Sequence, residues 1–105
     1  EKVSTAAPVL IAYFDESRLH DYLRLATAIR AAGIGVELFP DAKKLGQQLK
    51  YADRRGFRIA LIAGGDEFAA GTCQVKNLAA GTQQNVPLDE GAGSLIAAIQ
   101  EMLTG

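Results

Sequence analysis

The chain has 105 residues, 49% of them hydrophobic, and a formal net charge of −1. This composition predicts one compact domain and argues against a disordered chain. No apolar run reaches the roughly 20 residues that a membrane-spanning helix needs. The lone Cys73 excludes an intrachain disulfide and a cysteine-cluster zinc site, as is typical of a reducing compartment such as the cytoplasm. We expect residues 8–105 to be the domain and residues 1–7 to be the end of a linker from an upstream domain.

The first half of the chain alternates predicted strands and helices. Pro8 to Phe14 is an apolar run of strand length, and Asp15 follows it as a candidate helix cap. The next segment carries a helical apolar stripe and stops at Gly33, a residue typical of the position after a helix. Three further elements follow, and they are a short alternating strand at residues 35–39, a helix that Asp41 can cap and that ends before Gly56, and an apolar strand at residues 58–63.

The second half has a different pattern. Residues 72–78 alternate apolar and polar side chains, residues 83–86 form another short strand, and the turn between them predicts a hairpin. Leu95, Ile99 and Met102 belong to the buried stripe of a terminal helix. The order predicts a three-layer α/β fold, with a five-stranded, mixed and mostly parallel sheet flanked by three helices.

The second predicted helix concentrates positive charge. Six of the eleven Lys and Arg residues fall between positions 43 and 58, where one acid, Asp53, opposes them. Helical spacing puts an apolar set on the side that should face the sheet, namely Leu45, Leu49 and Ala52. The row nearly opposite, which we call the cationic ridge, consists of Lys43, Gln47, Lys50 and Arg54. The adjoining exposed row is expected to hold Lys44, Gln48, Tyr51 and Arg55.

A solvated helix face is the simplest interpretation of these two rows. Solvated faces usually mix charges of both signs, however, and an unrelieved row of like charges costs a few tenths of a kcal/mol per pair. An anionic partner therefore becomes a reasonable explanation. The amides and the aromatic ring are groups that read and stack single-stranded bases. Gly46 interrupts the helix, either to let a nucleic-acid backbone approach or because it lies in the first turn.

The chain resembles the C-terminal anticodon-binding domain of class II aminoacyl-tRNA synthetases, and the histidyl members are the most similar of these. The resemblance rests on four stretches, which are residues 44–53 (Lys-Leu-Gly-Gln-Gln-Leu-Lys-Tyr-Ala-Asp), residues 62–67 with Gly71, residues 75–78 and residues 81–83. It extends from about Val9 to the terminal helix. Three positions differ from residues common in histidyl members, namely Gly65, Asn77 and Thr82.

The resemblance implies that this domain holds the anticodon loop of histidine tRNA beside a catalytic domain. It implies that Glu67 and Lys76 contact anticodon bases or the nearby backbone, and that the cationic helix contacts the loop and its phosphates. The full set of expected tRNA-binding residues is Lys43, Lys44, Gln47, Gln48, Lys50, Tyr51, Arg54, Glu67, Lys76 and Asn77. The ridge and Lys76 are expected to form one continuous cradle for unpaired nucleotides.

No arrangement of residues predicts catalysis by this domain alone. The single histidine, His20, is expected to be solvent-exposed, and Cys73 to be a packed thiol. The resemblance implies a parent histidine–tRNA ligase, a cytoplasmic homodimer that uses ATP and Mg²⁺ in a catalytic core elsewhere, with no cofactor here and no membrane or DNA partner. The alternative is a regulatory module of a histidyl-synthetase-like paralogue, which binds RNA or protein without aminoacylation.

Overall fold

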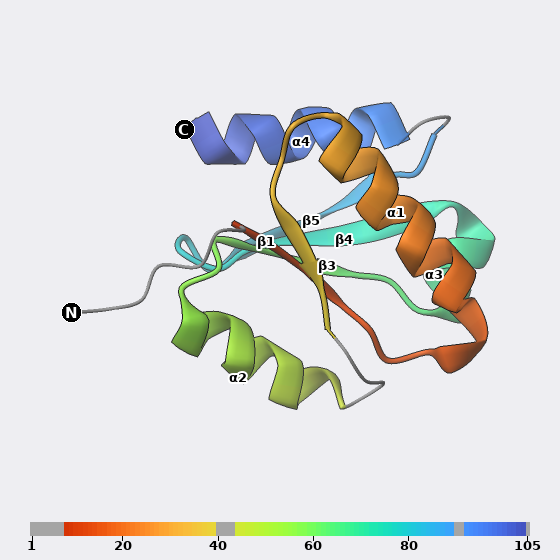
Figure 1. The fold of residues 1–105 in the computed structure, drawn as a ribbon, viewed down its shortest axis with the longest axis horizontal. Coiled ribbons are helices and arrows are strands. Elements are labelled where there is room, and N and C mark those ends of the chain that lie inside the picture. The colour runs from red at the N-terminus through yellow and green to blue at the C-terminus, as the bar shows by residue number, and fades with distance from the viewer. Residues whose placement is uncertain (1–7, 40–43, 90–91, 105) are drawn as a thin grey trace.

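A computed structural model describes residues 8–39, 44–89 and 92–104. Figure 1 shows a twisted sheet with helices on both sides. In chain order the elements are β1 (Val9–Ala12), the 3-10 helix η1 (Glu16–Arg18), α1 (Leu19–Ala31), β2 (Val36–Leu38), α2 (Leu45–Arg55), β3 (Ile59–Ile62), α3 (Gly65–Ala70), β4 (Thr72–Asn77), β5 (Thr82–Pro87) and α4 (Gly93–Thr104). The predicted linker at residues 1–7 and the predicted cap Asp41 lie outside the described residues.

The five strands form one sheet in the order β2-β1-β3-β4-β5. Strand β1 pairs in parallel with β2 and with β3, whereas the β3–β4 and β4–β5 pairs are antiparallel. The five-stranded mixed sheet and its three main helices are confirmed. The expectation of mostly parallel pairing is wrong, because the short connection through α3 and the tight turn after β4 return the chain directly, without the crossover that parallel pairing requires.

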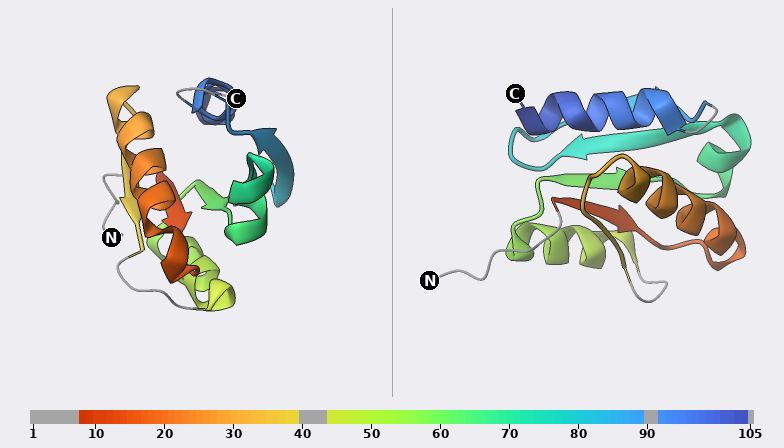
Figure 2. Two further views of the ribbon diagram at one scale, coloured as in Figure 1. Left: turned by 90° about the vertical axis from the view of Figure 1, so that its right-hand side faces the viewer. Right: turned by 45° about the horizontal axis from the view of Figure 1, so that its top comes forward.

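Helices cover the two faces of the sheet differently. Side chains alternate along β1, so that Val9 and Ile11 face one side and Leu10 the other. The larger core lies between the first face and helices α1 and α4, where Ile29 and Ile99 are fully buried. The smaller core lies between the other face and α2, and Figures 1 and 2 show α2 on the side of the sheet away from α1 and α4. Helix α2 therefore stands alone on its side of the sheet among the described helices.

Local signals explain where the longer helices begin and end. The Asp15 carboxylate accepts hydrogen bonds from the backbone N–H (3.1 Å) and the hydroxyl (2.6 Å) of Ser17, which caps the entry into η1 and α1. Gly33 and Gly56, the residues at the ends of α1 and α2, have φ values of 84° and 81°. The sequence pattern predicts only the end of a strand after β3, and the structure forms the six-residue helix α3 there.

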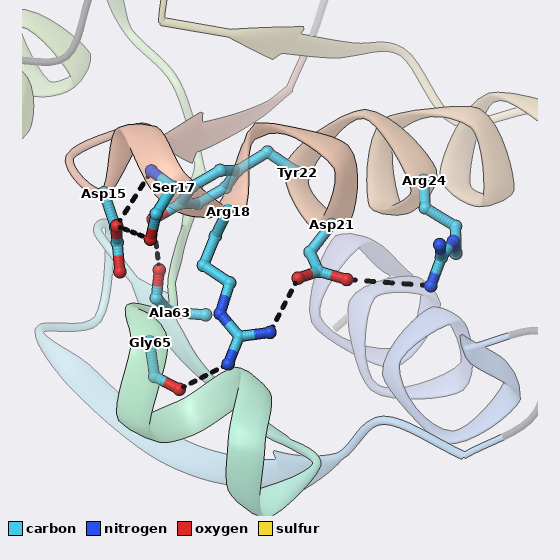
Figure 3. A network of polar contacts seen from close by, with 8 residues as sticks. All are labelled: Asp15, Ser17, Arg18, Asp21, Tyr22, Arg24, Ala63 and Gly65. Carbon is cyan, nitrogen blue, oxygen red and sulfur yellow. Dashed lines mark hydrogen bonds and ion pairs between the residues drawn. The ribbon is translucent and has the colours of Figure 1, made fainter.

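A polar network joins the start of α1 to the end of β3 (Figure 3). The Arg18 guanidinium donates to the Asp21 carboxylate at 3.2 Å and reaches the carbonyl oxygen of Gly65 at 3.5 Å. The Tyr22 hydroxyl donates to the carbonyl oxygen of Ala63 at 2.5 Å, in the buried interior. These contacts fix the turn that leads from β3 into α3.

Candidate nucleic-acid interface

The cationic segment forms helix α2 as predicted, and its ends suit its charge. Phe57 donates its backbone N–H to the Ala52 carbonyl oxygen at 3.0 Å, the bond that closes a helix ending in a left-handed glycine. Arg54 and Arg55 lie in the last turn, where positive side chains interact favourably with the helix dipole. The helix dipole therefore favours two of these positive charges, those of Arg54 and Arg55, whether or not an anion binds there.

Gln48 does not lie on the exposed side of α2. Its side chain is fully buried, and its Oε1 accepts from the backbone N–H of Tyr13 while its Nε2 donates to the Tyr13 carbonyl oxygen, both at 2.6 Å. Leu45 and Leu49, which were expected to face the sheet fully, are half-buried, although Ala52 is buried as predicted. The prediction that Gln48 contacts RNA is therefore wrong, because a fully buried amide cannot reach a ligand.

The remaining described members of the two rows are accessible. Lys44, Gln47, Lys50 and Arg54 are exposed, and Lys43 lies outside the described residues. Tyr51 is half-buried. Its ring contacts that of Phe39 edge-on, at a centroid distance of 5.2 Å, and the Arg55 guanidinium lies 5.5 Å from the same ring centre. A base that stacks on Tyr51 would have to compete with Arg55.

The contact between Tyr51 and Phe39 shows which way α2 is rotated. Phe39 follows the edge strand β2, so the side of α2 that carries Tyr51 is turned toward that edge. Gln47 and Arg54 lie one turn before and after Tyr51 on this side. The opposite side of the helix, nearer β3 and β4, carries Gly46, Leu49 and Asp53.

The expected continuous cradle is not present in this form. The described residues of the ridge, Gln47, Lys50 and Arg54, point to solvent and toward β2, while Lys76 lies on β4, on the other side of α2. Gly46 occupies the first turn of the helix, and a Cβ built on it would meet no other atom of the described residues within 4 Å. No close packing against that part of the chain therefore requires a glycine at this position.

A second polar surface, which we call the open sheet face, lies on β4 and β5. Lys76 is the cross-strand neighbour of Ala60 on β3 and of Gln83 on β5, and therefore lies on the α2 side of the sheet. Gln74 pairs with Asn85 on the same side, and the Gln83 Nε2 donates to the Gln74 Oε1 at 3.3 Å. Since α2 lies over β1, this part of the sheet presents Gln74, Lys76, Gln83 and Asn85.

Sequence reasoning found Lys76 on this face but did not assign Gln74, Gln83 or Asn85 to the site. The alternation in β4 of the buried Cys73 and Val75 with polar residues was a usable signal, because it predicts that Gln74 and Lys76 share one face. It did not show that this face lacks a covering helix. That fact depends on which strands α2 packs against.

Glu67 and Asn77 have local structural partners. The Glu67 carboxylate accepts from the backbone N–H of Gly64 at 2.8 Å and so caps α3, while Asn77 accepts at 3.1 Å from the N–H of Ala80 in the turn after β4. Because successive strand residues point to opposite faces, Asn77 does not share the face of Lys76. Glu67 and Lys76 lie near opposite ends of β4, so the structure does not bring these predicted residues together.

Gly65, one of the three positions expected to differ from histidyl members, lies close to the Asp15 carboxylate. A Cβ on Gly65 would lie 2.9 Å from the Asp15 Oδ2, so the end of the Asp15 side chain would have to shift to admit one. An acid at position 65 would also place a second negative charge beside Asp15. The hydrogen bond from the Ser17 hydroxyl holds the pKa of Asp15 below its usual value, so this carboxyl stays charged. Glycine at position 65 is thus matched to the local contact with Asp15.

Neither a metal site nor a reactive thiol emerges from the described residues. They contain no group of three or more His, Cys, Asp or Glu side chains placed to hold a metal ion. His20 is exposed as predicted, and Cys73 is fully buried. Burial raises the pKa of Cys73 to about 12, which keeps the thiol protonated and unreactive. In the same part of the chain, no helix is long and apolar enough to cross a membrane.

Comparisons with known proteins agree with this architecture. The family model described as "Anticodon binding domain" matches residues 8–98. The histidine–tRNA ligase of Rhodopirellula baltica is 52% identical over 99 residues, which cover 93% of this chain and 22% of that protein, and the ligase of Xanthomonas oryzae is 38% identical over 97 residues, which cover 92% and 21%. The crystal structure of histidyl-tRNA synthetase from Nostoc sp. matches with a TM-score of 0.84 and 30% identity, over 92% of this chain and 21% of that one.

The chain spans about a fifth of the length of these relatives. Its sequence and its overall fold place it in one family with them. The chain belongs to the anticodon binding domain family, and it is similar to the members of that family found in histidine–tRNA ligases.

Proposed function

We propose that this chain is the anticodon-recognition domain of a histidine–tRNA ligase. The observation that carries the proposal is the open sheet face, on which three amides and Lys76 lie together on two adjacent strands. Amides and ammonium groups donate to and accept from the edges of unpaired bases, and this kind of sheet surface is one that RNA-binding modules use. The similarity to histidine–tRNA ligases over nearly the whole chain supports histidine tRNA as the partner.

In this proposal one surface reads bases and a second surface contacts phosphates. The open sheet face, with Gln74, Lys76, Gln83 and Asn85, reads bases of the anticodon loop. Lys44 at the N-cap of α2 and Lys50 and Arg54 on the helix contact phosphates, because exposed cations bind the backbone without regard to sequence. Base reading and phosphate binding are thus assigned to different sides of α2, which makes them separable by mutation.

The chemistry of the parent enzyme lies outside this domain. A ligase that activates histidine with ATP and Mg²⁺ would hold both in its own catalytic core, and the domain would contribute binding energy remote from the reacting atoms. We expect the parent to be a cytoplasmic homodimer. The regulatory alternative gains no support from Gly65, since the contact with Asp15 explains that departure locally.

The test is a titration of the domain with two RNA hairpins, the anticodon stem-loop of histidine tRNA and the same stem with a scrambled loop. Tighter binding of the first is expected. Equal affinity for both would argue against base reading and favour a module that binds RNA without codon meaning. Absence of binding to either hairpin at low salt would refute an RNA function altogether.

A further inference from the structure

The contact between Gln48 and Tyr13 lies where the sheet can no longer satisfy the backbone. Tyr13 is one residue beyond the end of β1, and the pairing of β1 with β2 ends at Ile11, whose carbonyl oxygen accepts from Phe39 at 3.2 Å. The Gln48 amide then takes the place of a neighbouring strand for Tyr13, with an acceptor and a donor in a planar arrangement. Both bonds are buried, where an unpaired N–H or C=O group is costly.

Two rotations of α2 compete on this sheet. Apolar packing alone would centre the buried side on Leu45, Leu49 and Ala52, as the sequence pattern predicts. The observed rotation centres it on Gln48 and Ala52, about 50° away, given that neighbouring helix residues are about 100° apart. Burying the Gln48 amide in place of a leucine has no hydrophobic advantage in itself, so the hydrogen bonds to Tyr13 favour this rotation. The same rotation packs the Tyr51 ring against Phe39 and Phe57, at centroid distances of 5.2 and 6.1 Å, which adds to that preference.

We propose that Gln48 is a positioning residue that selects the rotation of α2 and thereby the direction in which Lys50 and Arg54 point. Rotation toward the apolar centre would turn the side that carries Tyr51 outward and separate its ring from Phe39. The effect of this rotation on RNA binding rests on the proposed function. The claim that Gln48 selects the rotation does not rest on it, and the rotation can be measured without RNA.

The decisive variant is Gln48→Glu, because a protonated glutamic acid has the same shape and the same donor and acceptor as glutamine. Its ionised form has no proton to donate to the Tyr13 carbonyl oxygen. Burial and this facing oxygen raise the pKa of a carboxyl at position 48 above the ordinary value of about 4.3. The variant should therefore keep the native rotation near pH 5 and lose it as the pH rises through the raised pKa.

The matched control is Gln47→Glu, which makes the same change of charge at the neighbouring, exposed position. A carboxyl there titrates near its ordinary value, so its effect on RNA binding should be constant between about pH 5.5 and 8. Two charged groups lie near position 48, namely Lys44 at the N-cap of α2 and Glu37, which lies on β2 on the face that α2 covers. The same pH series on the wild-type protein measures any contribution from these two groups, and that contribution is subtracted. Gln48→Met adds an apolar side chain of similar length, which cannot restore the bonds at any pH.

Two readouts are needed, at a temperature where circular dichroism shows every variant folded. Nuclear Overhauser contacts between the rings of Tyr51 and Phe39 report the rotation, and hairpin affinity reports its effect on RNA. For Gln48→Glu we expect both to be close to wild type near pH 5, and the ring contact to vanish with a roughly tenfold loss of affinity near pH 8, the size of one lost charge-assisted hydrogen bond.

Ring contacts that persist in Gln48→Met, or in Gln48→Glu at high pH, would overturn the proposal. Lost ring contacts with unchanged affinity would also overturn its claim about RNA. If the wild-type domain binds no hairpin while the ring contact of Gln48→Glu still depends on pH, the positioning role stands and the proposed function fails.

Discussion

Removing two exposed cations from α2 should flatten the salt dependence of RNA binding. The double substitution Lys50→Ala and Arg54→Ala deletes two exposed side chains on the outward side of the helix. Each lost phosphate contact on a single strand reduces the slope of log affinity against log salt by about 0.7, and two reduce it by about 1.4. The affinity ratio of wild type to variant should then shrink by about sevenfold between about 50 and 200 mM salt.

The assay is a salt series of hairpin titrations with the histidine loop and the scrambled loop. The loss should be the same for both loops, because phosphate contacts carry no sequence information. Arg24→Ala is the control: this arginine is also exposed, with 78% of its side chain accessible, but it lies on α1 on the other side of the sheet. An unchanged slope in the double variant, or an equal change in Arg24→Ala, would refute the assignment of phosphate contacts to α2.

Lys76→Ala should act differently from the α2 variants. Lys76 lies on the open sheet face among amides, so its loss should reduce discrimination between the two loops by about 1–3 kcal/mol, the scale of one good base contact. Gly46→Ala should stabilise the domain by up to about 1 kcal/mol in urea unfolding, because the helical position is open and alanine favours helix; destabilisation would show that the site is strained. Burial raises the pKa of Cys73 to about 12, so its thiol should resist an aromatic disulfide reagent at pH 8 until the protein unfolds. Rapid reaction of the folded protein would contradict the burial of this thiol. Asp89→Ala should lower the melting temperature near neutral pH but not at low pH: hydrogen bonds from Ser94 lower the pKa of Asp89, so its stabilisation is present above the ordinary value of 3.8 and is lost as the pH falls through the lowered one. A difference that persists in acid would show that these hydrogen bonds do not depend on the charge.

Features that depend on nearby residues were predictable from the sequence. The five strands, the three longer helices and the glycines that end α1 and α2 follow from apolar periodicity and from turn chemistry, which act over a few residues. The burial of Cys73 and the exposure of His20 followed in the same way. The resemblance of residues 44–53 and 62–67 to a known family added the expected kind of ligand.

Features that depend on contacts between residues far apart in the sequence were not predictable from it. Helical spacing assigned Gln48 to the exposed row beside the apolar set Leu45, Leu49 and Ala52. An amide is costly to bury alone, and its partner Tyr13 lies 35 residues away in the sequence. The equal number of parallel and antiparallel pairs, and the open sheet face, depend on which strands come to lie side by side. The sequence thus determined the three longer helices, the five strands and the positive charge of α2, while the tertiary structure decided the rotation of α2 and the exposed face of β4 and β5. The physical reason is that the cost of burying a polar group depends on a partner that only the folded chain brings within hydrogen-bonding distance.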